Sequence, residues 1–234
     1  ADGQPCNNIA AWNGSAWLIQ FADDYASVGQ YSSLALDSLG RAHISYYDAT
    51  ATALKYNYFN GSVWVPSTVD NAADVGKYTS IALDASDRPR IAYYDATNAT
   101  LKYASWNGAA WQIQTVDTLG TYLEPAPLDF GFPDLPLTPQ VTTPEPAISL
   151  TLDASGAPQI AYYHSATQDL RFARLVGSVW QIVTVDAPND VGQFASLALF
   201  GEAGNPYIAY YDATNHALKL ATGLNARFYF PLTR

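Results

Sequence analysis

The chain has 234 residues and a net charge of −10, with only 11 Lys and Arg residues against 21 Asp and Glu residues. This balance argues against a protein that binds nucleic acid or an anionic membrane surface, because both need clustered basic side chains. No stretch reaches the ~18 consecutive apolar residues that a membrane-spanning helix requires. We therefore expect no membrane insertion.

The sequence starts at Ala1 and contains no methionine. We interpret this as the mature form of a secreted protein whose signal peptide has been removed, and we expect an extracellular or cell-surface location. Cys6 is the only cysteine, so an internal disulfide framework is excluded. A free thiol is the simpler interpretation of Cys6, and an intermolecular disulfide is the alternative.

The first predicted elements are two short strands within residues 8–23, joined by an Asn-Gly turn at Asn13. Residues 31–77 then form the first complete repeat, for which four strands, A to D, are predicted. Strand A is Tyr31–Asp37, strand B contains Ile44–Asp48, strand C contains Leu54–Tyr56, and strand D is Trp64–Asp70. The strands within residues 8–23 match strands C and D of this unit.

The same pattern recurs at residues 78–122, 147–193 and 194–232, with Phe228–Leu232 as the expected last strand D. The string Ile-Ala-Tyr-Tyr-Asp-Ala-Thr of residues 91–97 is its clearest marker, and a repeat architecture follows from the recurrence. The period is 47 residues, from Tyr31 to Tyr78 and again from Ala147 to Phe194.

Residues 123–146 interrupt the repeat and hold seven of the fourteen prolines. Such a density of proline sustains neither a strand ladder nor a helix. We expect this insertion either to fold back over the repeats or to serve as a docking arm for a protein partner. Its apolar residues and those near the last repeat are the candidate docking residues: Phe130, Phe132, Leu135, Leu137, Phe228, Tyr229 and Phe230.

Four strands in about 40–50 residues are typical of a β-propeller blade. Strand A alternates leucine with serine and alanine, whereas strand D carries tryptophan, which matches blades that crowd near an axis and diverge outward. We predict an all-β chain, a single propeller domain of residues 1–234 with four-stranded antiparallel blades. Four blades are favoured and five are the alternative, and residues 8–23 are expected to complete the last blade.

The strings Ser-Leu-Ala-Leu-Asp at Ser33, Ile-Ala-Tyr-Tyr-Asp at Ile91 and Leu-Lys-Tyr at Leu101 resemble the tandem β-propeller repeats of secreted and cell-surface bacterial proteins. The resemblance covers most of the chain. It implies the fold and says little of activity, because propellers host many unrelated functions.

In such blades the B–C turns and D–A links share one face, which is therefore expected to be acidic. The motif aspartates Asp48, Asp95 and Asp212, with His164 at the same position in the third repeat, are candidate ligand-binding residues. The simpler interpretation is a turn cap or an ion pair with the lysine seven residues later. Clustered carboxylates could also hold calcium, with Asp70, Asp74, Asp186 and Asp190 as the candidate ligands. No other cofactor is expected.

Tryptophan and tyrosine could provide platforms for sugars. Trp12 and Trp106, at C–D turns, are the candidate sugar-binding tryptophans, whereas Trp17, Trp64, Trp111 and Trp180 are expected between blades.

Three functions remain open. The first is a non-enzymatic extracellular module for protein assembly or adhesion, which associates with itself or with other subunits. The alternative is a lectin that binds glycans, and the second alternative is a hydrolase acting on polysaccharide. No carboxylate pair stands out as catalytic, so we favour a protein that is not an enzyme.

Overall fold

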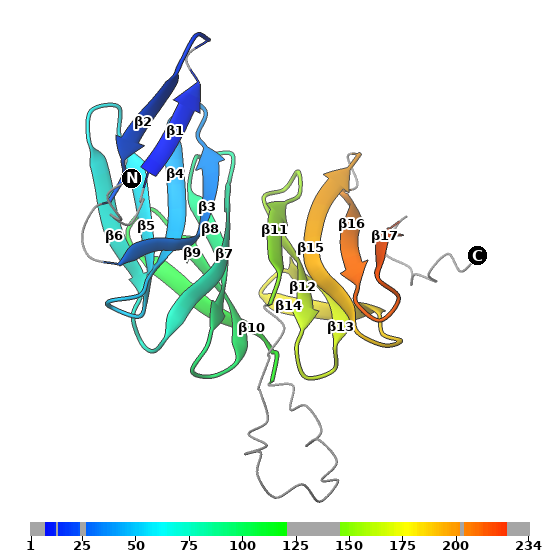
Figure 1. Cartoon of the computed structure of the whole chain (residues 1–234). Coiled ribbons are helices and arrows are strands. Elements are labelled where there is room, and N and C mark those ends of the chain that lie inside the picture. Colours follow the sequence, from blue (N-terminus) through cyan, green and yellow to red (C-terminus); the bar gives the residue numbers. More distant parts are fainter. Residues whose placement is uncertain (1–7, 13, 24–26, 121–145, 202–203, 224–234) are drawn as a thin grey trace, which may run out of the picture.

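The computed structural model describes residues 8–12, 14–23, 27–120, 146–201 and 204–223, and every regular element in these ranges is a β-strand. The strands form five antiparallel sheets that follow one another in chain order (Figure 1). Within the described ranges no helix is long and apolar enough to span a bilayer.

Three sheets have four strands and constitute complete blades. The first blade contains β3 (Val28–Leu36), β4 (Ala42–Asp48), β5 (Ala53–Phe59) and β6 (Trp64–Asp70). The second contains β7 (Val75–Leu83), β8 (Pro89–Asp95), β9 (Thr100–Trp106) and β10 (Trp111–Thr118). The third contains β11 (Ile148–Leu152), β12 (Pro158–His164), β13 (Asp169–Val176) and β14 (Val179–Asp186).

Two sheets are incomplete among the described residues. The last blade contains β15 (Val191–Phe200), β16 (Asn205–Asp212) and β17 (Ala217–Thr222), which correspond to strands A, B and C. The N-terminal hairpin contains β1 (Asn8–Trp12) and β2 (Trp17–Phe21), which correspond to strands C and D. The strands predicted within the described residues are thus observed, and the all-β propeller with four-stranded blades is confirmed.

The turns between strands form for local reasons. At the C–D turns, the side-chain oxygens of Asn60 and Asn107 each accept two backbone N–H bonds from the residues that follow. The A–B turns begin with Asp37, Asp84 and Asp153, whose carboxylates accept backbone N–H groups two and four residues later. Side-chain acceptors of this kind replace backbone partners in a tight turn.

The core lies between blades rather than within them. Leu54 and Tyr56 of the first blade pack against Val75 and Tyr93 of the second, and all four are buried. Equivalent clusters join the second blade to the third and the third to the last. Each blade is therefore stabilised by apolar contact with its chain neighbours, as expected for sheets that stack face to face.

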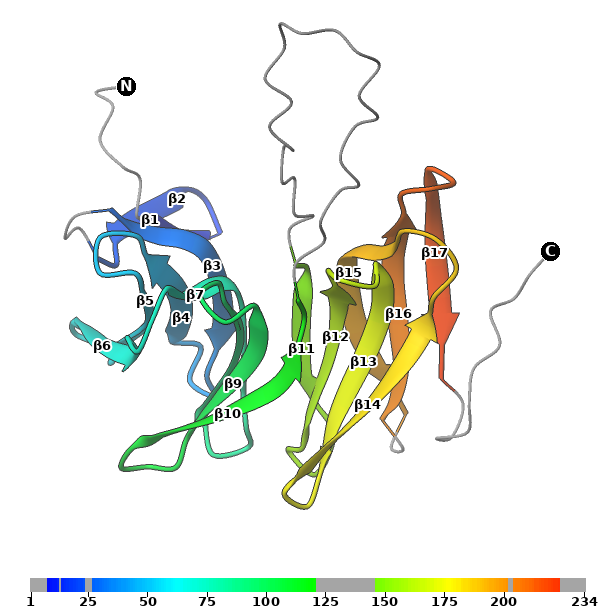
Figure 2. The ribbon, with the colours of Figure 1, turned by 90° about the horizontal axis from the view of Figure 1, so that it is seen from below.

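The A strands of successive blades lie side by side on the inside of the array. The backbone N–H groups of Ile81, Leu150 and Leu197 donate to the hydroxyl oxygens of Ser33, Ser80 and Ser149, at 3.1, 3.0 and 3.0 Å respectively. This explains the serine in the first three A strands, because a small side chain permits the close approach and supplies the acceptor. Figures 1 and 2 show that the sheets follow an arc with β1–β2 at one end and β17 at the other.

Residues 8–23 do not complete the last blade, contrary to expectation. They form a sheet of their own beside the first blade, where the backbone oxygen of Ala22 accepts a 2.6 Å bond from the Asn57 side chain. The physical reason is local, since a strand D is linked directly to the next strand A and stays beside it. The expected strand at Phe228–Leu232 and most of the insertion at 123–146 lie outside the described residues.

The close approach of blades predicts a specific sensitivity at Gly76. A Cβ there would lie 2.6 Å from the Cα of Leu54, whereas a Cβ at Gly61, which has a similar φ of +102°, would meet nothing within 4 Å. We expect Gly76→Ala to destabilise the fold by about 1–3 kcal/mol more than Gly61→Ala. Urea denaturation of both variants measures this, and equal losses of stability would contradict the blade contact.

Candidate functional site

The polar side chains of the tyrosine–aspartate string connect each blade to the preceding one. The first tyrosine of the string donates its hydroxyl to the aspartate at the end of the preceding strand D. The four bonds are Tyr46–Asp23 at 2.6 Å, Tyr93–Asp70 at 2.7 Å, Tyr162–Asp117 at 2.8 Å and Tyr210–Asp186 at 2.7 Å. Burial raises the pKa of these tyrosines, and the aspartate that each hydroxyl faces raises it further.

A cation from strand C completes three of these junctions. Lys102 Nζ lies 2.6 Å from Asp70 of the preceding blade and 3.7 Å from Asp95 of its own blade. Arg171 contacts Asp117, and Lys219 contacts Asp186, in the same way. Burial raises the pKa of Asp70, but the hydrogen bonds from Lys102 and Tyr93 outweigh it and leave the pKa below its ordinary value. The predicted pair of Asp95 and Lys102 within one hairpin is therefore present. The shorter contact of Lys102 is the one to Asp70 in the preceding blade.

The four candidate ligand residues at the end of strand B are buried in turn caps. Asp48 accepts the backbone N–H groups of Thr50 and Ala51, while Asp95 and Asp212 accept both the backbone and the side chain of an asparagine. His164 takes the same place and bonds Thr167 through Nδ1. Burial and the nearby Arg171 lower the pKa of His164. A neutral imidazole thus replaces a carboxylate without loss of the cap.

The four candidate calcium ligands also have protein partners. Asp70 and Asp186 accept the tyrosine and lysine bonds above. Asp74 accepts Tyr47 at 2.6 Å and Lys77 at 2.7 Å, and Asp190 accepts Tyr163 and Gln193. Among the described residues, no three His, Cys, Asp or Glu side chains are grouped as a metal site would require.

On the face formed by the B–C turns and D–A links, each of three A strands carries an aromatic residue in an unusual backbone conformation. We call these residues the aromatic rim. Tyr31, Tyr78 and Phe194 occupy equivalent positions in strand A, each at φ of 54° beside a register shift. The rings of Tyr31 and Tyr78 are 4.4 Å apart. Bulges commonly redirect a side chain in this way, and here they bring the rings of Tyr31 and Tyr78 together.

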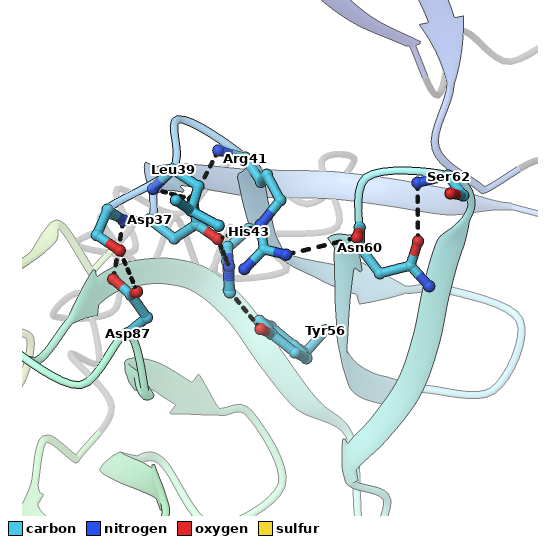
Figure 3. Close-up of polar contacts among 9 residues, drawn as sticks. Asp37, Leu39, Arg41, His43, Tyr56, Asn60, Ser62 and Asp87 are labelled. Atoms are coloured by element: carbon cyan, nitrogen blue, oxygen red, sulfur yellow. Dashed lines mark hydrogen bonds and ion pairs between the residues drawn. The ribbon is translucent and has the colours of Figure 1, made fainter.

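The opposite face is formed by the A–B turns, and two of its aspartates, Asp37 and Asp84, are paired with arginines. Figure 3 shows Asp37 beside Arg41 and His43, with the Nε of Arg41 2.6 Å from the carboxylate. Burial opposes ionisation of Asp37, but the bonds from Arg41 and Leu39 hold its pKa at about 2. The Nδ1 of His43 lies 2.5 Å from the hydroxyl of Tyr56, and burial lowers the pKa of this imidazole.

The A–B turns of the first two blades are tied together. Ser38 donates its backbone N–H and its hydroxyl to the two carboxylate oxygens of Asp87, at 2.9 and 2.6 Å (Figure 3). At the next junction the residues in these two positions are Ala85 and Gly156, which cannot make either bond. A cavity of about 350 Å³ lies between the second and third blades there, and both residues line it.

The remaining walls of this cavity are rich in hydrogen-bonding groups. Asp84 binds Arg88 at 2.9 Å and Arg90 at 2.7 Å, and across the cavity Asp153 accepts the hydroxyl of Ser155. Arg90 also donates to the backbone oxygen of Trp106, while its buried Nε has no hydrogen-bond partner within the described part of the chain. The cavity therefore offers donors and acceptors at several angles, as binding a small polar ligand requires.

The tryptophans divide differently from the prediction. Trp111 and Trp180 pack edge-on against Tyr56 and Tyr103 of the preceding blade, at 5.4 and 5.3 Å, as expected. Trp17 is 64% exposed, so its expected place between blades was wrong. Its hairpin contains only strands C and D, which provide no stack to enclose it. Trp106 is half-buried, and the backbone of Trp12 lies in β1 opposite Trp17.

The predicted docking residues are not placed by the structure. Phe130, Phe132, Leu135, Leu137, Phe228, Tyr229 and Phe230 lie outside the described residues. The cavity itself was missed by sequence reasoning, although the change from Ser38 and Asp87 to Ala85 and Gly156 between repeats was a visible signal.

The chain matches no protein-family model and no curated protein. It is similar in structure to a triple arginine-to-alanine variant of AofleA from Arthrobotrys oligospora, with a TM-score of 0.60 and 15% identity, over 94% of this chain and 63% of that one. It is also similar to a fucose-specific lectin from Aleuria aurantia, with a TM-score of 0.54 and 12% identity, over 96% of this chain and 69% of that one.

A variant of the Aleuria aurantia lectin in complex with fucose α1-6-linked to GlcNAc gives a TM-score of 0.53 at 14% identity, with the same coverage of 96% and 69%. A xylan β-1,4-xylosidase from Bacillus halodurans reaches only 0.45, which is too low to support an argument. At these identities the similarities establish the β-propeller fold and nothing finer. The chain spans 63% of the length of AofleA.

The junction at Asp70 predicts a pH-dependent contribution to stability. Asp70→Asn leaves Lys102 without its closest carboxylate, and we expect a loss of about 3 kcal/mol at pH 7. Because the pKa of Asp70 is lowered by folding, its contribution is present above about pH 4 and fades as pH falls through the folded value. Urea denaturation of both proteins from pH 7 to pH 3 should show their stabilities converging.

Asp87→Asn is the matched control for this prediction, since its bonds to Ser38 are exposed. We expect it to cost less than about 1 kcal/mol. A constant difference between Asp70→Asn and the parent at every pH would contradict the assignment.

Proposed function

We propose that this protein is a carbohydrate-binding β-propeller that is not an enzyme and that takes a sugar in the cavity between its second and third blades. The observation that carries the proposal is the cavity formed where Ala85 and Gly156 replace the Ser38–Asp87 tie. Its volume of about 350 Å³ falls within the usual range of small-ligand sites.

The lining of the cavity fits the chemistry of sugar hydroxyls. A hydroxyl both donates and accepts, so it is bound well where a carboxylate and a guanidinium lie side by side. Asp84 with Arg90 provides such a pair, and Ser155 with Asp153 provides a second group across the cavity. The fold similarity to fucose-specific lectins supports a sugar over other small polar ligands.

The carboxylates of the cavity argue against hydrolysis. Burial raises the pKa of Asp84 and of Asp153, but backbone and side-chain hydrogen bonds outweigh it, and both pKa values are below the ordinary one. A glycosidase needs one protonated carboxylic acid as its general acid. Neither group would hold that proton at neutral pH, so we infer binding without turnover.

The assembly or adhesion hypothesis remains a prediction, as does extracellular location. The similarity in fold to the fucose-specific lectin of Aleuria aurantia favours sugar binding over assembly as the main function.

Titration calorimetry against a panel of monosaccharides, with methyl α-L-fucoside included, tests the proposal. We expect Arg90→Ala to weaken binding at least tenfold, since a buried donor next to Asp84 is removed. Arg174→Ala is the control, because Arg174 bonds only Gln181 on the exposed side of β13 and β14 among the described side chains. Equal affinities of the parent and Arg90→Ala for the bound sugar would contradict the site.

A second variant fills the cavity instead of truncating one of the side chains that line it. Ala85→Ser with Gly156→Asp restores the tie seen between Ser38 and Asp87. Asp87 itself has a φ of 58°, and a Cβ at Gly156, which has a φ of +81°, would meet nothing within 4 Å. We expect this variant to fold and to lose sugar binding. If this variant still binds the sugar and Tyr78→Ala does not, the sugar binds at the aromatic rim and the proposed site is wrong.

A further inference from the structure

The outer face of the last blade exposes residues that the other blades bury. Leu218 is 83% exposed, whereas Leu54, Leu101 and Leu170, its equivalents in strand C, are fully buried. Leu220 is 61% exposed, and its equivalents Tyr56, Tyr103 and Phe172 are at most 8% exposed. Strand C of the last blade thus has the apolar surface of an interior strand, and no described strand covers it.

Interior junctions show what covers this surface. A Cβ at Gly76 or Gly192 would lie within 3 Å of Leu54 or Leu170, so the start of a following strand A presses directly on this leucine. Val75 and Val191 of the same strands are fully buried in the clusters. The matching partner for Leu218 is therefore the inner edge of another blade of this repeat.

The first blade carries such an edge with part of it uncovered. Leu34 and Leu36 of β3 are 54% and 62% exposed. The equivalents of Leu34, namely Ile81, Leu150 and Leu197, are 6 to 9% exposed because strands A and B of the preceding blade cover them. No described strand A or B precedes the first blade.

The N-terminal hairpin supplies the rest of that junction. Asp23 accepts the hydroxyl of Tyr46 just as Asp70 accepts that of Tyr93, so β2 stands in the place of a preceding strand D. β1 stands in the place of strand C, but it begins with Asn8-Ile9 where interior strands have Lys-Tyr or Arg-Phe. β17, with Leu218-Lys219-Leu220, matches that pattern better.

We propose that two copies of this chain form a composite blade, in which β15, β16 and β17 of one copy provide strands A, B and C and β2 of the next provides strand D. β17 takes the place that β1 holds in the single chain. Leu218 then packs against the start of β3, and Leu34 and Leu36 are covered by β15 and β16. The contact is heterologous and repeats the interior junction of the fold, with strand addition at the edge of β17, which pairs with no other strand among the described residues.

Light scattering after size exclusion over a concentration series tests the proposal. We expect the parent chain to associate as concentration rises. Leu218→Asp with Leu220→Asp, and separately Leu34→Asp with Leu36→Asp, should each raise the concentration needed at least tenfold. Val179→Asp is the matched control, since Val179 is 64% exposed in β14 of the third blade, which contributes to neither face. Circular dichroism confirms that each variant is folded.

Mixing the two double variants distinguishes this contact from others. Each retains one intact face, so an equimolar mixture should form a 1:1 dimer that grows no further. Removal of residues 1–12, which vacates the place of β1, should lower the concentration needed for association. A parent chain that stays monomeric throughout, either double variant associating like the parent, or a mixture that stays monomeric would each overturn the proposal. If residues 224–234 of the same chain cover Leu218, the parent chain stays monomeric, which is the first of these outcomes.

Discussion

The structure depends on one repeated contact, the hydrogen bond from a tyrosine in strand B to the aspartate that ends the preceding strand D. The cation of strand C lies beside this aspartate and so contacts two successive blades, as Lys102 does with Asp70 and Asp95. A buried carboxylate without partners would be costly, and a tyrosine hydroxyl and an ammonium group together satisfy it. The contact therefore fixes how each blade meets the next while apolar packing supplies most of the stability.

Much of this could be predicted from the sequence. The strand order, the Asn-Gly turns and the pairing of Asp95 with Lys102 follow from local patterns within one repeat, and the structure confirms them. The contact between blades was not predicted, because Tyr93 and Asp70 belong to different repeats. Their separation of 23 residues recurs at Tyr46 and Asp23, which is a signal that a comparison across repeats could have used.

The candidate ligand residues illustrate the same limit. The sequence singles out Asp48, Asp95, Asp212 and His164 because they recur, but recurrence here reflects a structural duty in capping the B–C turns. The cavity arises instead where the repeat differs, at Ala85 and Gly156. In a repeat protein, shared residues maintain the fold, and local departures from the repeat create sites.

Trp17 and Leu218 show where the repeat misleads. Both occupy positions that are buried or half-buried in complete blades, and both are exposed because the sheets that contain them are incomplete within the described residues. Periodicity predicts which side chains could pack, while burial depends on whether a neighbouring blade is present.

The most direct test of sugar binding in the cavity is nuclear magnetic resonance of the arginine Nε–Hε groups during titration with a sugar that binds. Arg90 and Arg171 both have a buried Nε without a partner among the described residues, one at the cavity and one at the junction on the opposite face. If the sugar occupies the cavity, the Arg90 signal shifts with saturation while that of Arg171 stays unchanged. A shift at Arg171 with none at Arg90 would contradict it.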